Sequence, residues 1–179
     1  GVKDSKMLSP RQRSFLYGKI KKFVKDYKIV KADPIDIDSF NQQGINLNYL
    51  EALKAAEIIN YLKPDIIYLD CPSPNLKAWK NDVYENLKHK EVKLIVEHKA
   101  EKYPVVGAAS IMAKVTRDNE IEKIQKMIPY KIGSGYPSDP ITKEFLKEHG
   151  DKYPEIFRKT WSTYKAHKED KKQKSLGDF

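Results

Sequence analysis

One stretch of the chain, residues 94–128, restricts the possible fold more than any other. It starts with the apolar residues 94–96, passes through a polar joint at residues 97–104, and continues with helical spacing over residues 106–128. A short buried strand that leads into a long helix is typical of proteins in which strands and helices alternate. We therefore expect an α/β layer fold.

Apolar periodicity and helix start and stop signals predict the remaining elements. Helices are predicted at residues 10–25, 36–40, 46–62, 76–87, 141–149 and 156–164, and strands at residues 27–30, 65–70 and 92–96. The glycines and prolines of residues 132–140 predict an irregular loop. The polar sequence from residue 166 predicts a flexible basic tail, so we expect one domain over residues 1–165 and a tail over residues 166–179.

Composition narrows the class of function. The chain has 34 Lys and Arg against 25 Asp and Glu, a net charge of +9, which favours a polyanionic partner, nucleic acid first, over a merely lysine-rich surface. The single cysteine, Cys71, excludes an internal disulfide and fits a reducing compartment, so we expect a cytoplasmic location. No apolar run approaches the ~18 residues needed to cross a membrane. The chain starts with Gly, so we expect further residues upstream.

Three acidic residues are candidate catalytic groups. Asp70 closes a predicted strand and is followed by two prolines, which hold its carboxylate at the rim of the sheet, where a magnesium ligand needs a fixed position. The alternative is an aspartate that starts a turn. Asp118 shares a helix face with apolar residues, so it is either functional or paired with Lys114. Glu101 lies in the polar joint. The alternative to a catalytic role is that it is a solvated loop residue.

Other stretches carry candidate substrate contacts. The small residues that end at Ser110 allow close backbone approach near a helix start, where amides favour phosphate, unless they serve only tight packing. Ser5 and Lys6 are candidate phosphate contacts or simply a solvated terminus. Two glycines and a proline fix Tyr136 as an exposed ring that can stack on a sugar or base, the alternative being a tyrosine at the core edge. No Walker loop, paired CxxC, HExxH or GxSxG occurs.

Together these stretches resemble the type 2 ribonucleases H, the ribonuclease HII family, in its archaeal form. The matching pieces are VKDSK at residues 2–6, IYLD at 67–70, EHKA at 97–100, YPVV at 103–106, AASI at 108–111, AKV at 113–115, GSGYPSDP at 133–140 and RKTW at 158–161. The stretch 97–118 and the GSGYPSDP loop are highly specific together. Matches run in order over nearly the whole chain.

The resemblance implies an RNase H-like fold with a mixed central sheet flanked by helices and a helical C-terminal extension. It implies an endonuclease that cuts the RNA strand of RNA–DNA hybrids and nicks duplex DNA 5′ of embedded ribonucleotides. Such sites use four carboxylates to hold two Mg2+ or Mn2+ ions. Asp70 matches the third family carboxylate, and Tyr136 matches the tyrosine that senses the ribose–deoxyribose junction. Ser5 and Lys6 match a phosphate-contacting segment, and we expect Ser110 and Lys114 on the nucleic-acid side.

The chain departs from the family at two metal-ligand positions. The family's opening strand, with its Asp-Glu pair, has no counterpart in this sequence. The family also reads His-Lys-Ala-Asp where residues 98–101 read HKAE before a shorter joint. Glu101 is therefore the candidate replacement ligand and Asp118 a supporting group. A hybrid-binding module of the same fold that does not cleave is the alternative function, and an unrelated phosphate-handling α/β enzyme is a more distant one.

The last residues resemble the motif that docks replication proteins on the sliding clamp. Gln173, Leu176 and Phe179 have the spacing that lets the two apolar side chains enter one pocket while the glutamine forms hydrogen bonds beside it. A lysine-rich tail can also produce this pattern by chance. The sequence therefore predicts a sliding clamp as a partner.

Overall fold

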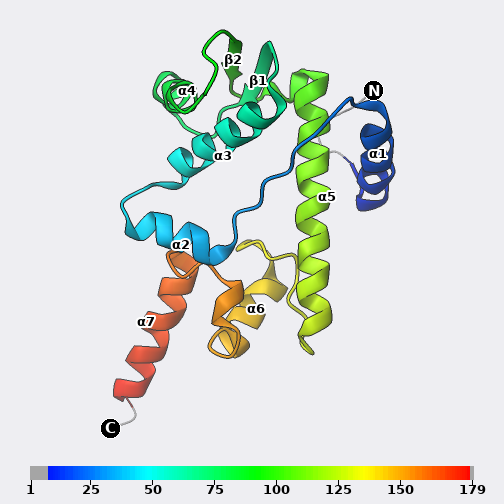
Figure 1. Ribbon diagram of the computed structural model, residues 1–179. Helices are drawn as coiled ribbons and strands as arrows, with labels where there is room; N and C mark the ends of the chain where they lie inside the picture. The colour runs from blue at the N-terminus through cyan, green and yellow to red at the C-terminus, as the bar shows by residue number, and fades with distance from the viewer. Residues whose placement is uncertain (1–7, 178–179) are drawn as a thin grey trace. The chain divides into compact units, whose positions relative to one another are not determined.

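The computed structural model describes the backbone of residues 8–177 and the side chains of residues 8–169. The elements are labelled in Figure 1. In chain order they are α1 (Pro10–Phe23), α2 (Pro34–Gln42), α3 (Leu47–Leu62), β1 (Ile66–Asp70), α4 (Leu76–Glu85), β2 (Lys93–Glu97), η2 (Ala100–Lys102), α5 (Pro104–Met127), α6 (Pro140–His149), η3 (Pro154–Ile156) and α7 (Ser162–Gly177), where η marks a 3-10 helix. Among these helices none is both long and apolar enough to cross a membrane.

The chain forms two compact units. The first contains Gly1–Lys31 and Asn46–Arg117, and the second contains Ala32–Ile45 and Asp118–Phe179. The first unit therefore holds the sheet, α1, α3, α4 and the first part of α5. The second holds α2, the end of α5, α6 and α7.

The sheet of the first unit consists of β1 and β2, which run parallel. Ile66 lies opposite Lys93, and Asp70 lies opposite Glu97. The connection through α4 makes a βαβ unit, as parallel strands require. A mixed sheet would contain an antiparallel strand, and the described residues contain only this parallel pair.

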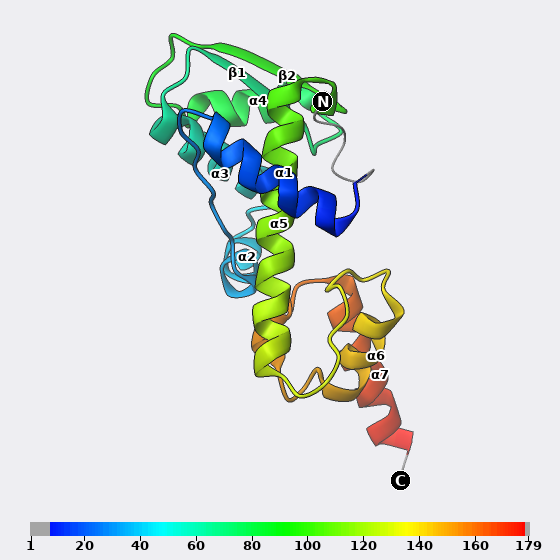
Figure 2. The same cartoon turned by 90° about the vertical axis from the view of Figure 1, so that its right-hand side faces the viewer.

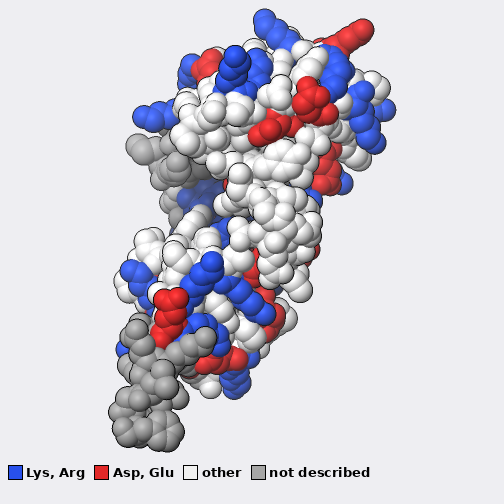
Figure 3. Space-filling view, turned by 90° about the vertical axis from the view of Figure 1, so that its left-hand side faces the viewer, with Lys and Arg blue, Asp and Glu red and all other residues white. Residues whose placement is uncertain are grey.

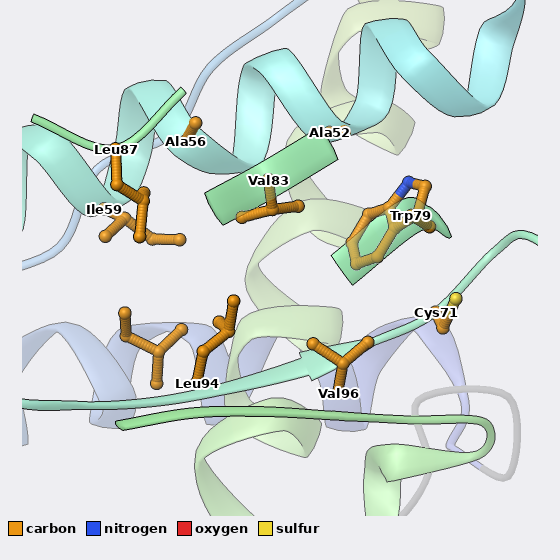
Figure 4. Close-up of a cluster of buried hydrophobic side chains, with 10 residues drawn as sticks. Ala52, Ala56, Ile59, Cys71, Trp79, Val83, Leu87, Leu94 and Val96 are labelled. Atoms are coloured by element: carbon orange, nitrogen blue, oxygen red, sulfur yellow. The ribbon is translucent and has the colours of Figure 1, made fainter. Parts of the chain in front are cut away.

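A hydrophobic core lies between the sheet and the helices α3 and α4 (Figure 4). Leu94 and Val96 of β2 point toward the helices, as residues two apart on a strand do. Trp79 and Val83 of α4 are buried against them, and the Trp79 Nε1 donates to the Asn48 carbonyl at 2.8 Å. The core therefore covers one face of the sheet and fixes which residues point to the other face.

A second core of the first unit joins α1 to the first part of α5, and α1 crosses α5 at an angle in Figure 2. Ile20 of α1 and Ile111, Met112 and Val115 of α5 are its buried members. Residues 27–30 pack against it in an irregular conformation, so the predicted strand is wrong there. Their apolar side chains cover two helices, and no strand of the sheet pairs with them.

The second unit has its own core around Ile128, Ile132 and Phe145. The predicted helix at residues 156–164 is wrong, because the chain leaves η3 at Phe157 and turns until α7 begins. The amides of Lys159 and Thr160 donate to the buried Asp38 carboxylate of α2, at 2.7 and 3.0 Å. These bonds replace the carbonyl partners that a helix would supply.

The C-terminal residues form α7 through Gly177, where the sequence predicted a flexible tail. Between Ser162 and Gly177 the chain has five Lys and one each of Ala, Glu, Gln and Leu, all of which are strong helix formers, and it has no proline. Tyr164 and His167 are buried in the first turns of this helix. The predicted tail over residues 166–179 therefore begins within a helix, and its flexibility stays a prediction.

Candidate active site

Two carboxylates lie opposite each other where β1 and β2 end. Asp70 is the last residue of β1, and Glu97 is the last of β2 and its partner in the register. Ile67, three residues before Asp70, belongs to the core under α3 and α4. Because side chains alternate along a strand, Asp70 and Glu97 both belong to the face away from these helices. The carboxyl ends of parallel strands are the usual place for functional groups in α/β proteins.

The joint after β2 returns to the end of β1 through backbone hydrogen bonds. The Cys71 amide donates to the Glu97 carbonyl at 2.9 Å, which extends the ladder by one residue. His98 Nδ1 lies 3.2 Å from the Cys71 carbonyl oxygen. Lys99 then adopts the left-handed conformation, with φ of 55°, and the chain enters η2. The turn therefore brings the amide of Ala100 to the rim of the sheet.

The Ala100 amide orients the Asp70 carboxylate. It donates to Asp70 Oδ1 at 2.9 Å, while Oδ2 accepts no hydrogen bond from the part of the chain that the structure describes. The side chain is exposed to solvent. One oxygen is thus fixed and the other is available, which suits a carboxylate that binds a divalent cation through one oxygen.

Glu97 is held by different partners. The Tyr103 hydroxyl donates to its Oε1 at 2.9 Å, and the Lys102 ammonium forms an ion pair with its Oε2. Lys102 first and Tyr103 second lower the pKa of Glu97, and Glu97 in turn raises the pKa of Lys102. The Tyr103 ring also packs on Tyr68, with centroids 4.5 Å apart. Glu97 is therefore ionised, but both of its oxygens are engaged.

Glu97 is a site residue that the sequence motifs did not predict. Its place in the site follows from the pairing register of β1 and β2, in which Glu97 lies opposite Asp70. A signal was present in the sequence, since both residues follow an apolar strand directly. Two parallel strands that end on carboxylates bring those carboxylates to one edge.

Glu101 lies close to Asp70 through the backbone. It occupies the middle of η2, directly after the residue whose amide binds Asp70, and its side chain is half-buried. The structure therefore brings the backbone of η2, which carries Glu101, to the end of β1, and the ligand role of Glu101 stays a prediction. Asp70 fits a metal ligand by its donor chemistry and its available oxygen. Among the described residues, however, no group of three or more His, Cys, Asp or Glu could hold a metal ion, so these residues alone do not form a complete metal centre.

Ser110 and Lys114 lie on α5, the helix that begins directly after the joint. They are four residues apart, so they share one face of the helix, and both are half-buried. They belong to the same unit as Asp70. Asp118 follows on α5 in the second unit, where it is also half-buried. The binding roles of Ser110 and Lys114 and the supporting role of Asp118 stay predictions.

The loop that presents Tyr136 is held by side chains of its own unit. Gly133 and Gly135 have φ of 69° and 73°, the left-handed region that favours glycine. The Thr142 hydroxyl accepts from the Gly135 amide and donates to the Ile132 carbonyl, both at 3.0 Å. Tyr136 retains 40% of its accessible surface, so the predicted exposed ring is confirmed.

Asp139 closes the same loop. Its Oδ2 accepts from the Ser134 amide at 2.6 Å, and its Oδ1 accepts from the Ile141 amide at 2.9 Å, which caps α6. Hydrogen bonds from Ser134, and then from the amides that follow Pro140, lower the pKa of Asp139 to about 2. The carboxylate is therefore ionised under ordinary conditions and serves the loop's geometry.

The predicted contacts at the two ends of the chain lie at or beyond the limits of the described residues. Ser5, Lys6 and Phe179 lie outside the described residues. Gln173 and Leu176 fall in the last turns of α7, where only the backbone is described. These assignments stay predictions.

The fold and the site define the class of α/β enzymes that place carboxylates at the carboxyl ends of sheet strands. More narrowly, the chain belongs to the ribonuclease HII family, whose model, described as Ribonuclease HII, matches residues 1–164. This is a family of metal-dependent ribonuclease H enzymes. The recognition made from the sequence motifs is therefore confirmed.

Individual relatives agree with this family. The chain is 46% identical to the Ribonuclease HII of Pyrococcus furiosus over 97% of the chain and 78% of that protein. The crystal structure of the ribonuclease H2 from Pyrococcus horikoshii OT3 superposes with a TM-score of 0.84 at 43% identity, covering 95% of this chain and 81% of that one. The structure of the PCNA:RNase HII complex from Archaeoglobus fulgidus superposes with a TM-score of 0.76 at 39% identity. The match covers 85% of this chain and 72% of that one. The RNase H-like α/β fold is thus confirmed.

Proposed function

We propose that this chain hydrolyses the RNA strand of RNA–DNA hybrids and nicks duplex DNA on the 5′ side of an embedded ribonucleotide. The observation that carries the proposal is the Asp70 carboxylate at the end of β1, oriented by the Ala100 amide with its other oxygen available. Family membership supports the reaction class. The net charge of +9 supports a nucleic-acid substrate.

In this proposal Asp70 holds a divalent ion, Mg2+ or Mn2+, and two ions act at the site. Carboxylate oxygen is the ligand type that both cations prefer. Glu101 is the second candidate ligand of the chain, because η2 carries it directly after the amide that binds Asp70. Glu97 is a poor candidate, because Lys102 and Tyr103 occupy its oxygens.

Substrate recognition in the proposal uses an aromatic ring and cationic or hydroxyl side chains. The exposed Tyr136 stacks on the sugar or base at the junction with deoxyribose. Ser110 and Lys114, together with Ser5 and Lys6, contact phosphates. Ribose selection by Tyr136 is tested with Tyr136→Ala, which is expected to weaken binding to a duplex with one ribonucleotide more than binding to plain DNA.

We further propose that the C-terminal residues bind a sliding clamp through Gln173, Leu176 and Phe179. A structural neighbour of this chain was solved as a complex with PCNA, which supports this partner. A triple variant Gln173→Ala, Leu176→Ala, Phe179→Ala is expected to lose clamp binding in a pull-down while its cleavage rate without clamp stays unchanged. If this variant still binds the clamp, the three residues are not the clamp-binding motif.

The central experiment uses a labelled DNA duplex with one ribonucleotide, incubated with Mg2+ or Mn2+. Wild-type chain is expected to produce a single nick 5′ of the ribonucleotide, and Asp70→Asn at least about a 100-fold slower reaction, because the amide cannot replace an ionised ligand. The variant keeps an oxygen for the Ala100 amide, so its unfolding curve serves as the folding control. Unimpaired cleavage by Asp70→Asn would refute the role of Asp70.

A second candidate is a hybrid-binding module that does not cleave. It is favoured by Glu101, which stands where the family motif has Asp. The same experiment separates the two functions. Binding of the wild-type chain to the hybrid without any product, in either metal, would support the second candidate.

A further inference from the structure

Two lysines of the first unit have a backbone conformation that lysine rarely adopts. Of the residues other than glycine that the structure describes, Lys63 and Lys99 have positive φ, 49° and 55°. This left-handed region costs free energy for a residue with a Cβ, and Gly, Asn and Asp occupy it most readily. Each lysine therefore stands where glycine or asparagine would fit with less strain.

The helix before Lys63 explains its conformation. Lys63 caps the end of α3, and its amide donates to the Ile59 carbonyl at 2.8 Å. A left-handed residue commonly ends a helix, and a cation there interacts favourably with the helix dipole. Lys63 lies three residues before β1 begins at Ile66, so it is near the end of the sheet away from Asp70.

Lys99 has no such explanation, because it follows a strand. β2 ends at Glu97, and the side chain of Lys99 is exposed. Lys99 forms no ion pair with any residue that the structure describes, whereas Lys102 of the same joint is paired with Glu97. The joint therefore offers the ammonium of Lys99, and not that of Lys102, to a ligand.

Lys99 is next to the candidate metal ligand. The Ala100 amide donates to Asp70 Oδ1 at 2.9 Å, and two bonds of about 1.5 Å or less join that nitrogen to the Lys99 Cα, which therefore lies within about 6 Å of Asp70 Oδ1. Five single bonds of about 1.5 Å connect this Cα to Nζ. A magnesium ion on Asp70 and a phosphate oxygen on that ion would each add only about 2.1 Å. A phosphate in front of Asp70 is thus within reach of the Lys99 ammonium.

Charge alone does not single out this lysine. The upper part of Figure 3 shows one face of the first unit, where Lys and Arg side chains are spread over the surface with Asp and Glu among them. Two properties distinguish Lys99 from a general surface lysine, namely its position beside Asp70 and its strained backbone. Strained residues of this kind gather at functional sites.

We propose that the Lys99 ammonium binds the nucleic-acid phosphate that faces Asp70, and that the left-handed turn presents it there. The contact carries no base information, because it is made to a phosphate oxygen. During cleavage this phosphate is the one attacked, and a cation beside it stabilises the charge that develops in the transition state. The inference rests on the proposed function and adds a substrate-contacting residue to it.

The test compares Lys99→Asn with Lys63→Asn. Asparagine is uncharged and tolerates the left-handed region, so both variants keep their turns, and each lowers the net charge by one, from +9 to +8. Lys99→Arg, which keeps the charge, is the rescue variant. Urea unfolding is expected to show no loss of stability in either asparagine variant. Binding to a 20-base-pair RNA–DNA hybrid is measured by fluorescence anisotropy in EDTA over a series of salt concentrations, and cleavage is measured with Mg2+ at saturating hybrid.

Lys99→Asn is expected to bind about fivefold more weakly at moderate salt, with a slope of log affinity against log salt that is shallower by about one unit. Its cleavage should be at least about tenfold slower. Lys63→Asn and Lys99→Arg should stay within about twofold of the wild-type chain in both measurements. Equal losses in the two asparagine variants, wild-type behaviour of Lys99→Asn, or an equal loss in Lys99→Arg would overturn the inference.

The wild-type chain separates this failure from that of the proposed function. If it cuts the hybrid and Lys99→Asn binds and cuts like it, only the role of Lys99 is refuted. If it binds but does not cut, the proposed function is refuted, and a shallower salt slope confined to Lys99→Asn still supports the phosphate contact. If it does not bind the hybrid at all, both are refuted.

Discussion

Asp70 Oδ1 and the Ala100 amide are joined by a hydrogen bond of 2.9 Å across 30 positions of sequence. The bond connects the end of β1 to the joint that follows β2. The orientation of the candidate metal ligand therefore depends on the joint's length and on the left-handed turn at Lys99. The conformation of the joint thus sets the orientation of Asp70 as well as the position of Glu101.

The first prediction separates this structural role of Asp70 from its chemical role. Asp70→Ala should lower the free energy of unfolding by about 1 kcal/mol, because the buried Ala100 amide loses its acceptor. Asp70→Asn keeps an acceptor oxygen and should stay within about 0.5 kcal/mol of wild type. Urea unfolding followed by circular dichroism measures both. Equal stability of the two variants would mean that the amide finds another partner.

The second prediction concerns the buried Asp38 carboxylate. It accepts from the amides of Lys159 and Thr160 and from the Thr160 hydroxyl, at 2.7, 3.0 and 2.6 Å. Asp38→Ala should destabilise the second unit by about 2–4 kcal/mol, because two amides and a hydroxyl lose a charged acceptor. Thr160→Val, which removes only the hydroxyl donor, should cost about 1 kcal/mol. Urea unfolding measures the loss of stability in each variant. A larger loss in Thr160→Val than in Asp38→Ala would contradict the prediction.

Asp38 also predicts a dependence on pH. Burial raises the pKa of this carboxyl group, but the hydrogen bonds from Thr160 and then Lys159 outweigh burial and bring the pKa below its ordinary value. Its contribution to stability is therefore complete above the unfolded value of about 3.9 and is lost as the pH falls through the lower folded value. The stability difference between the wild-type chain and Asp38→Asn should shrink as the pH is lowered from 5 to 2. A constant difference over that range would contradict the assignment.

Many elements could be predicted from the sequence because their signals are local. The predicted helix at residues 46–62 is observed as Leu47–Leu62, and the strand that ends on Asp70 has the predicted end. Apolar spacing and caps such as Asn46, whose side chain accepts from the Tyr49 amide at 2.9 Å, determine these boundaries within a few residues. The Asp70 site was recognised for the same reason, since a strand followed by two prolines has a fixed end.

The features that escaped prediction depend on distant contacts. Residues 159 and 160 look helical by spacing, but their amides bind a carboxylate about 120 positions earlier in the chain. The engagement of Glu97 follows from Lys102 and Tyr103, which reach it only because η2 turns the chain back. Periodicity carries no information about such partners, because the same local pattern fits both a helix and a turn held by a distant side chain.

The fourth prediction is a titration in the Tyr136 loop. Hydrogen bonds from Ser134 hold the pKa of Asp139 at about 2. The loop's hydrogen bonds should therefore persist down to about pH 3 and be lost as the pH falls through 2. The amide shift of Ser134, followed by NMR, should titrate with a midpoint near 2 and should not titrate in Asp139→Asn. A midpoint near the ordinary value of about 3.9 would show that the carboxylate is not held by the loop.

The last prediction uses two glycines that share a backbone conformation but differ in their surroundings. Gly133 and Gly44 have φ of 69° and 78°. A Cβ at Gly133 would lie 2.7 Å from Asp139 Oδ2 and from Thr142 Oγ1, and 2.8 Å from the Thr142 amide nitrogen, whereas a Cβ at Gly44 would meet nothing within 4 Å.

Gly44→Ala therefore isolates the backbone cost of a left-handed alanine, about 1 kcal/mol. Gly133→Ala adds the displacement of Asp139 and Thr142 and should cost at least about 2 kcal/mol more. Because these two residues hold the loop that presents Tyr136, Gly133→Ala should also weaken binding to a duplex with one ribonucleotide, whereas Gly44→Ala should not. Urea unfolding and fluorescence anisotropy measure the two effects. Equal costs in both variants would mean that the loop opens without loss, which would contradict a rigid presentation of the tyrosine.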